Sequence, residues 1–326
     1  MAQTNSRKIF WWDWVLLIFI ICLASFFRWR GINWDQNQHY HPDERYIAWV
    51  ASSVDFLGND RFADAFTTNK STFNPFYWPA ESENDGIALL KDEPRDFAYG
   101  HLPLYLGVAA ENLTSWGLNN RSDDQLSEPV QLFKSLPTFD RVTLVGRWLS
   151  GLFDLATVVL VFILGRNLAG TKVGLTASLF LALNVMHIQQ AHFFISDPPL
   201  AFFVVLTILM LVWSLPPKQE IFDAEPNPFP DWLWFAGMAT GLAIGSKFSA
   251  IILGLPAFFV ILILSRQKVV WRSIKYCLIV LIVFFITNPF AILDSSFALE
   301  FGDGRITLEG SVPGACYLQN LSLIHI

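Results

Sequence analysis

The residues best suited to chemistry gather in one short stretch, His39-Tyr40-His41-Pro42-Asp43-Glu44-Arg45-Tyr46. It follows shortly after an apolar segment that is long enough to cross a bilayer. An acidic pair at a membrane surface is typical of a site that does chemistry or binds ions. There Asp43 can face water, a metal or a substrate hydroxyl, while neighbouring helices hold a lipid-linked reactant. The pattern indicates an enzyme that acts on lipid-borne substrates.

Composition places the chain in a membrane. Hydrophobic residues make up 53% of the 326 residues and charged residues only 15%, which is far from the average of soluble domains. Most of the net charge of -6 lies between Asp35 and Asp96, where twelve acidic residues meet five basic ones. Because the basic residues are few and scattered, no face suits nucleic acid. The three cysteines define no disulfide framework.

The apolar pattern predicts an all-α polytopic membrane protein with about seven membrane-spanning helices. The first runs from Trp11 to Phe27, and because no small-residue cleavage site follows it, we interpret it as an uncleaved anchor. Several of the later spans are near the lower limit of about 17 residues for a spanning helix. They are predicted at residues 141–164, 173–190, 198–215, 232–246, 248–264 and 274–290.

The segment from His101 to Trp116 is apolar, but it carries Glu111 and a proline near its start. If this segment crossed the bilayer, the strongest basic loop, at residues 266–275, would move to the outer side, against the positive-inside tendency. We therefore predict that it lies along the membrane surface as a juxtamembrane helix. A second amphipathic piece, Arg45 to Leu57, is predicted on the same surface.

These assignments divide the chain into four parts. Residues 1–30 form a cytoplasmic stub and the first span, and residues 31–140 form a large outer loop with the juxtamembrane helices. Residues 141–300 form a six-helix transmembrane module, and residues 301–326 form a tail. Because the pattern of spans stops abruptly, we expect this tail to be truncated or aberrant, with further spans encoded downstream.

Several motifs follow one another over roughly residues 10 to 300. They are the Asp43-Glu44 pair, a Pro103-Leu104-Tyr105 helix start, Arg147 opening the second span, the turn ending at Gly170, and Ser196-Asp197-Pro198 opening the fourth span. In this order the motifs resemble those of the type C glycosyltransferases. Among these, the chain is most similar to bacterial relatives of the dolichyl-phosphate-mannose protein mannosyltransferases and of the lipid A aminoarabinose transferase.

The resemblance implies transfer of a sugar from a polyprenyl-phosphate donor to a protein, lipid or glycan acceptor. Transfer would occur on the non-cytoplasmic face of the plasma (inner) membrane, with inversion at the anomeric carbon. Asp43 would be the catalytic base, since a departing phosphate needs little protonation. Glu44 would either orient Asp43 or tie the loop to the transmembrane core. The alternative is that Asp43 only caps the helix that starts near Arg45.

Five further residues are candidates for substrate binding: His41, His101, Arg147, Asp197 and Lys247. His101 is placed by the resemblance to meet the donor phosphate, and Arg147 to pair with an outer-loop carboxylate or a phosphate. Asp197 matches a cavity carboxylate of the family, but it is also an ordinary helix N-cap before two prolines. Lys247 has two interpretations: its ammonium group either binds the substrate or extends to the lipid headgroups without a role in binding.

Two questions stay open at this point. The spacing His39-x-His41-x-Asp43 resembles a metal site, so a divalent metal is conceivable although no cofactor is certain. A polytopic transporter with intramembrane Asp and Arg coupling sites is the alternative function. Asp154, in mid-span, is predicted to face the bundle interior, with a partner that the sequence does not reveal. No internal repeat supports that alternative.

Overall fold

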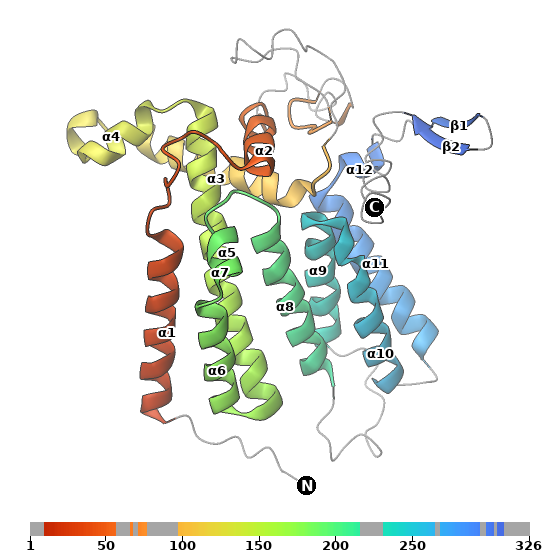
Figure 1. The fold of residues 1–326 in the computed structure, drawn as a ribbon. Coiled ribbons are helices and arrows are strands. Elements are labelled where there is room, and N and C mark those ends of the chain that lie inside the picture. Colours follow the sequence, from red (N-terminus) through yellow and green to blue (C-terminus); the bar gives the residue numbers. More distant parts are fainter. Residues whose placement is uncertain are drawn as a thin grey trace.

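The computed structural model describes residues 10–56, 66–67, 71–76, 97–215, 231–264, 268–293, 298–302 and 305–309. Within these residues the chain is an all-helical bundle with one short β-hairpin beside it (Figure 1). The N-terminal end of the described chain lies at one end of the bundle, and helices α2, α3 and α4 lie at the opposite end. Asp43 and Glu44, the residues predicted from the sequence to be catalytic, are part of α2 and so lie at that opposite end.

Four helices of the described residues are long and apolar enough to cross a membrane. They are α1 (Trp11–Trp29), α5 (Thr138–Ala169), α8 (Asp197–Ser214) and α11 (Val269–Thr287). Three shorter helices stand beside them (Figure 1), α6 (Thr171–Ala182), α9 (Asp231–Ser246) and α10 (Gly254–Leu264). Helix α5 packs against α6 and α8, α8 packs against α9, and α9 packs against α11.

Two of the predicted spans are interrupted. The segment 173–190 is two helices, because α6 ends at Ala182 and α7 (Val185–Gln190) begins after Asn184. The Asn184 side chain accepts a hydrogen bond from the His187 backbone N–H at 3.2 Å, which makes it the N-cap of α7. The segment 248–264 begins with the 3-10 helix η4 (Phe248–Leu253) before α10. The apolar pattern of the sequence predicted both apolar segments, but it did not predict the interruption within either of them.

The turn between α5 and α6 requires glycine. Gly170 has φ +96°, a conformation that is open to glycine and strained for other residues. The two helices then approach closely, since a Cβ atom on Gly174 would lie 2.5 Å from the carbonyl oxygen of Phe162. This tight hairpin places α6 beside α1 and α5.

Helix α3 (His101–Asn119) runs across the end of the bundle and packs against α2, α5 and α9 (Figure 1). Helix α2 (Pro42–Ser52) has its apolar face buried, with Ile47, Ala48, Val50 and Ala51 in one core with residues of α3, α5 and the segment before α8. The 3-10 helix η3 (Asp123–Gln125) and α4 (Glu128–Ser135) connect α3 to α5.

After α11 the chain forms the short helix α12 (Phe290–Leu293). Strands β1 (Ala298–Gly302) and β2 (Arg305–Glu309) then pair antiparallel, with Ala298 opposite Glu309 and Gly302 opposite Arg305. The rest of the predicted tail, residues 310–326, lies outside the described residues. The same holds for the predicted cytoplasmic residues 1–9 and for the basic loop residues 265–267.

Candidate active site

A buried ion cluster ties α2 to the bundle. The Arg147 guanidinium of α5 donates to the Glu44 carboxylate at 2.8 and 2.7 Å and to the Asp35 carboxylate at 2.8 and 2.7 Å. All three side chains are 0% exposed. Burial raises the pKa of Asp35, but the hydrogen bond and charge of Arg147 outweigh it and hold this pKa below its usual value. We call Asp35, Glu44 and Arg147 the Arg147 cluster.

Glu44 also reaches the segment that leads into α8. Its Oε1 atom accepts a hydrogen bond from the Phe194 backbone N–H at 2.7 Å. Glu44 therefore joins α2, α5 and the chain just before Asp197, and it is buried. Of the two roles expected for Glu44, the geometry fits the one that ties the loop to the core, and the Glu44 side chain does not line an open site.

Asp43 precedes Glu44 and is exposed. It lies in the first turn of α2, where Pro42 is the first residue and His41 is the N-cap. The His41 Nδ1 atom accepts the Glu44 backbone N–H at 3.3 Å. The capping role considered for Asp43 is thus wrong, because His41 performs it, and the Asp43 carboxylate is left for other contacts.

Tyr99 contacts Asp43 from the chain before α3. The pKa of Tyr99 is raised by burial and also by the charge of Asp43 and a hydrogen bond from the Tyr99 hydroxyl to its carboxylate. The charge of Asp197 acts in the same direction, which places Asp197 in the same neighbourhood. Sequence reasoning missed Tyr99, and its only signal was its position two residues before His101.

Asp197 and Lys247 form an ion pair at the same end of the bundle. The Lys247 Nζ atom lies 3.0 Å from the Asp197 Oδ1 atom, and the two side chains are 44% and 40% exposed. Asp197 is the first residue of α8, and the N-cap position belongs to Ser196. The N-cap role considered for Asp197 is therefore wrong. We call Asp43, Tyr99, Asp197 and Lys247 the Asp43 cluster.

A close contact between Gly100 and Gly245 brings the segment that carries Tyr99 next to the segment that carries Lys247. A Cβ atom on Gly100 would lie 2.0 Å from the carbonyl oxygen of Gly245 and 2.6 Å from that of Ser246, so no side chain fits there. The His101 backbone N–H donates to the Asn288 side chain at 2.7 Å, which fixes the start of α3 against the end of α11. Tyr99 is thereby held beside the chain that leads to Lys247.

His101 lies apart from the Asp43 cluster. Its ring is fully buried and packs against Phe76, Phe97 and Tyr105, with ring centroids 5.0, 6.2 and 5.6 Å away. Within the described residues neither ring nitrogen has a hydrogen-bond partner. Burial lowers the pKa of His101 to about 3, so the ring is neutral at physiological pH. In this arrangement His101 does not present a charge to a donor phosphate.

The residues of the metal-like spacing have separate partners. The His39 Nε2 atom lies 2.7 Å from the Asp140 Oδ1 atom, His41 caps α2, and Asp43 contacts Tyr99. In the part of the chain that the structure describes, no group of three or more His, Cys, Asp or Glu side chains is arranged to hold a metal ion.

A second buried ion cluster lies further along α5. Asp154 accepts hydrogen bonds from Arg28 of α1 and from the His187 Nδ1 atom of α7, the latter at 2.6 Å. Arg28 is 0% exposed and also donates to the carbonyl oxygens of Ala24 and Ala182. Asp154 thus faces the bundle interior as predicted, and the partners that the sequence did not reveal are Arg28 and His187.

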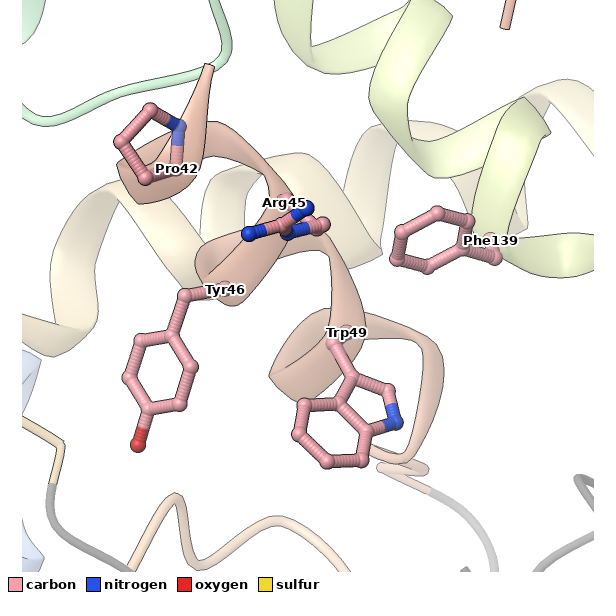
Figure 2. Close-up of a pocket in the computed structure, with 5 residues that line it drawn as sticks. All are labelled: Pro42, Arg45, Tyr46, Trp49 and Phe139. Carbon is pink, nitrogen blue, oxygen red and sulfur yellow. The ribbon is translucent and has the colours of Figure 1, made fainter. Parts of the chain in front are cut away.

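An open pocket of about 620 Å³ lies along α2. Four of its lining residues, Pro42, Arg45, Tyr46 and Trp49, come from α2, and Phe139 comes from the first turn of α5 (Figure 2). The pocket occupies the face of α2 that is turned away from the buried Ile47.

Comparison with known proteins agrees with this architecture. Residues 131–293, half of the chain, match the family model described as dolichyl-phosphate-mannose-protein mannosyltransferase. The chain belongs to this family and is a multi-pass integral membrane protein. No curated protein matches the chain significantly.

Two solved structures share the fold. The oligosaccharyltransferase of Archaeoglobus fulgidus in its apo form has a TM-score of 0.56 and 14% identity, over 98% of this chain and 33% of that chain. The oligosaccharyltransferase AglB from Archaeoglobus fulgidus, in complex with an inhibitory peptide and a dolichol-phosphate, has a TM-score of 0.51 and 11% identity, over 97% of this chain and 37% of that chain. The chain thus spans about a third of the length of the solved structures it matches.

Proposed function

We propose that the chain is the catalytic part of a membrane glycosyltransferase that moves a sugar from a polyprenyl-phosphate carrier to an acceptor hydroxyl. One observation carries the proposal, namely that an exposed carboxylate, Asp43, is fixed by a buried ion cluster next to a tyrosine, a second carboxylate and a lysine. The family of the chain supports a sugar donor on a lipid phosphate. The relative solved with a dolichol-phosphate and a peptide supports a peptide acceptor.

Asp43 acts as the base in this reaction. It takes the proton of the acceptor hydroxyl as the oxygen attacks the anomeric carbon of the donor sugar. The bond between that carbon and the phosphate oxygen breaks, and its electron pair leaves with the phosphate. One displacement inverts the anomeric carbon, and a single carboxylate suffices because the phosphate is a good leaving group. The Tyr99 hydroxyl orients the Asp43 carboxylate.

Lys247 binds the phosphate of the donor. An ammonium group pairs well with phosphate oxygens, and the Lys247 side chain is 44% exposed, so a lipid phosphate has access to it. Asp197 holds the ammonium at 3.0 Å and sets its position relative to Asp43. Arg147 and Glu44 serve as positioning residues, because both are buried in the Arg147 cluster.

The site faces the non-cytoplasmic side in this proposal. The support is the basic residues next to the short connections at the end of the bundle opposite to the Asp43 cluster, namely Arg166 and Lys172 at the α5–α6 turn and Lys268 just before α11. A lipid carrier in the outer leaflet then presents its phosphate at the level of α2 and α3.

Sugar transfer from a panel of radiolabelled polyprenyl-phosphate sugars, in membranes that contain the chain, tests the proposal. We expect labelled product with at least one donor, and none in membranes without the chain. The transporter alternative would use Arg28 and Asp154 as coupling groups. Solute flux across vesicles with no sugar transfer would favour that alternative and contradict the proposal.

A further inference from the structure

We propose that Asn288, the residue that follows α11, is a positioning residue for sugar transfer, because its side chain holds the segments that carry Tyr99 and Lys247 in place. Asn288 is not part of the Asp43 cluster and acts through these two segments. The inference rests on the proposed function, because it names a residue that supports the site of that reaction.

The Asn288 side chain is fully buried, and both of its polar atoms are hydrogen-bonded. The Oδ1 atom accepts the His101 backbone N–H at 2.7 Å. The Nδ2 atom donates to the Thr287 hydroxyl at 2.9 Å and to the Phe284 carbonyl oxygen at 3.2 Å. Because a carbonyl oxygen only accepts and a backbone N–H only donates, these partners fix one orientation of the buried amide.

Asn288 performs for α3 the task of an N-cap. The first backbone N–H groups of a helix have no partner within it, and the residue before the helix usually supplies an acceptor. At α3 that residue is Gly100, where a Cβ atom would lie 2.0 Å from the Gly245 carbonyl oxygen, so no capping side chain fits. Asn288 supplies the missing acceptor to His101 from 187 residues away in the sequence.

The same side chain contacts the end of α9. A Cβ atom on Gly245 would lie 2.9 Å from the Asn288 Nδ2 atom, so α9 comes this close only through a glycine. Lys247 follows two residues later, and its ammonium group pairs with Asp197 at 3.0 Å. The buried amide of Asn288 therefore supports the segment that presents the proposed phosphate-binding lysine.

On its other side, Asn288 supports the segment that carries Tyr99. Tyr99 lies two residues before His101, and its hydroxyl donates a hydrogen bond to the Asp43 carboxylate. A shift of the first turn of α3 would move Tyr99 relative to Asp43. One buried amide thus lies between the residue that orients the proposed base and the residue that binds the donor phosphate.

A contribution to folding alone is the competing interpretation of Asn288. Helix α3 packs against α2, α5 and α9, so the body of this helix is held by other contacts. The bond from Asn288 fixes only the first residue of α3, next to the segment that carries Tyr99. Loss of this bond should therefore displace the start of α3 and leave the bundle assembled.

The ¹⁹F resonance of 3-fluorotyrosine at position 99, in the chain purified in nanodiscs, tests the inference. Asp43→Asn removes the charge that faces the Tyr99 hydroxyl, so it should shift this resonance in the unchanged chain. In Asn288→Ala the shift caused by Asp43→Asn should largely disappear, because Tyr99 is displaced. Asn288→Asp keeps an acceptor for the His101 N–H and should keep the shift.

Asn184→Ala is the matched control, because it removes another side-chain cap, whose bond to the His187 backbone N–H is 3.2 Å long. This variant should have a lower melting temperature, as Asn288→Ala should, but it should keep the shift of the Tyr99 resonance. Sugar transfer should fall about tenfold or more in Asn288→Ala, because the reacting groups are misplaced, and stay nearly normal in Asn184→Ala.

A full shift of the Tyr99 resonance in Asn288→Ala would overturn the inference, and so would a resonance that does not respond to Asp43→Asn in the unchanged chain. Equal loss of the shift in Asn184→Ala would also overturn it, since the effect would then follow stability. The same holds if Asn288→Asp loses the shift as completely as Asn288→Ala.

The resonance is measured without turnover, so the inference and the proposed function can fail separately. The expected pattern of shifts, with no sugar transfer by the unchanged chain, would count against the proposed function alone. Sugar transfer by the unchanged chain, with equal transfer by Asn288→Ala, would count against the inference alone.

Discussion

Asp43 and Glu44 are neighbours in sequence with different environments. Glu44 is fully buried and makes hydrogen bonds with the Arg147 guanidinium and the Phe194 backbone N–H, whereas Asp43 is exposed and accepts a hydrogen bond from the Tyr99 hydroxyl. Adjacent residues of a helix point about 100° apart, so one can enter the core while the other faces outward. In the proposed reaction, Glu44 thus holds α2 in position, and Asp43 is the group that reacts.

Tyr99 should matter for catalysis more than for folding. Tyr99→Phe removes the hydrogen bond to Asp43 and leaves the carboxylate free to rotate, so we expect sugar transfer to fall about tenfold with a melting temperature close to that of the unchanged chain. Tyr105→Phe is the matched control, because its hydroxyl donates to the Phe73 carbonyl oxygen at 3.0 Å and lies outside the Asp43 cluster. Equal effects of the two variants would remove Tyr99 from the site.

His101 should make the fold sensitive to acid. Its folded-state pKa of about 3 lies below the unfolded value near 6.5, so between these pH values only the unfolded state binds the proton. Stability is therefore complete above pH 6.5 and decreases as the pH falls towards 3, by about 2 kcal/mol between pH 7 and pH 5.

His101→Phe keeps an aromatic ring among Phe76, Phe97 and Tyr105 and removes the titrating group. We expect the loss of stability between pH 7 and pH 5 to be smaller in this variant by about that amount. Thermal unfolding in detergent at both pH values gives the comparison. The same loss in both proteins would show that His101 is protonated in the folded state.

At the level of elements, the Arg147 cluster fixes the position of α2 against α5. Glu44→Gln leaves the buried Arg147 with only Asp35 as a full counter-charge and weakens the link to Phe194. We expect the free energy of unfolding to fall by about 3 to 5 kcal/mol, the usual effect of breaking a buried pair, and sugar transfer to fall as Asp43 moves.

Asp123→Asn provides the control for that variant. It breaks the ion pair with Lys134, whose atoms lie 2.8 Å apart, but the Asp123 side chain is 72% exposed, so little stability should be lost. Denaturation curves of both variants in the same detergent provide the measurement. A loss for Glu44→Gln as small as that for Asp123→Asn would contradict the role given to the Arg147 cluster.

The helices were largely predictable from the sequence, and the contacts between them were not. Apolar runs gave α1, α5, α8 and α11, because a lipid-facing helix needs a continuous apolar surface. The break at Asn184 depends on one side-chain cap inside an apolar run. The partners of Arg147 lie more than a hundred residues away in the sequence, and Tyr99 enters the site next to the place where Gly100 packs against Gly245. A single sequence shows neither contact.

At the scale of the whole molecule, α2, which carries Asp43, lies at one end of the bundle, and the α5–α6 turn and the start of α11 lie at the other end (Figure 1). Asp124, after α3, lies at the end with α2 and α4, while Val270, in the first turn of α11, lies at the other end. This separation is what a membrane enzyme needs when its donor is presented on one leaflet.

Cysteine labelling tests the orientation of the chain. In a background without Cys22, Cys277 and Cys316, we expect a membrane-impermeant thiol reagent to label Asp124→Cys in intact cells. Val270→Cys should be labelled only after the cells are broken. Labelling of position 270 from outside would reverse the proposed orientation.

The most direct test of the proposed function is the activity of Asp43→Asn. This substitution keeps the size of the side chain and a partner for Tyr99 but removes the base, so sugar transfer should fall by about 10² or more. The melting temperature should stay the same, because Asp43 is exposed and outside the Arg147 cluster. Asp124→Asn, at another exposed position, should transfer sugar normally. Near-normal transfer by Asp43→Asn would contradict the account.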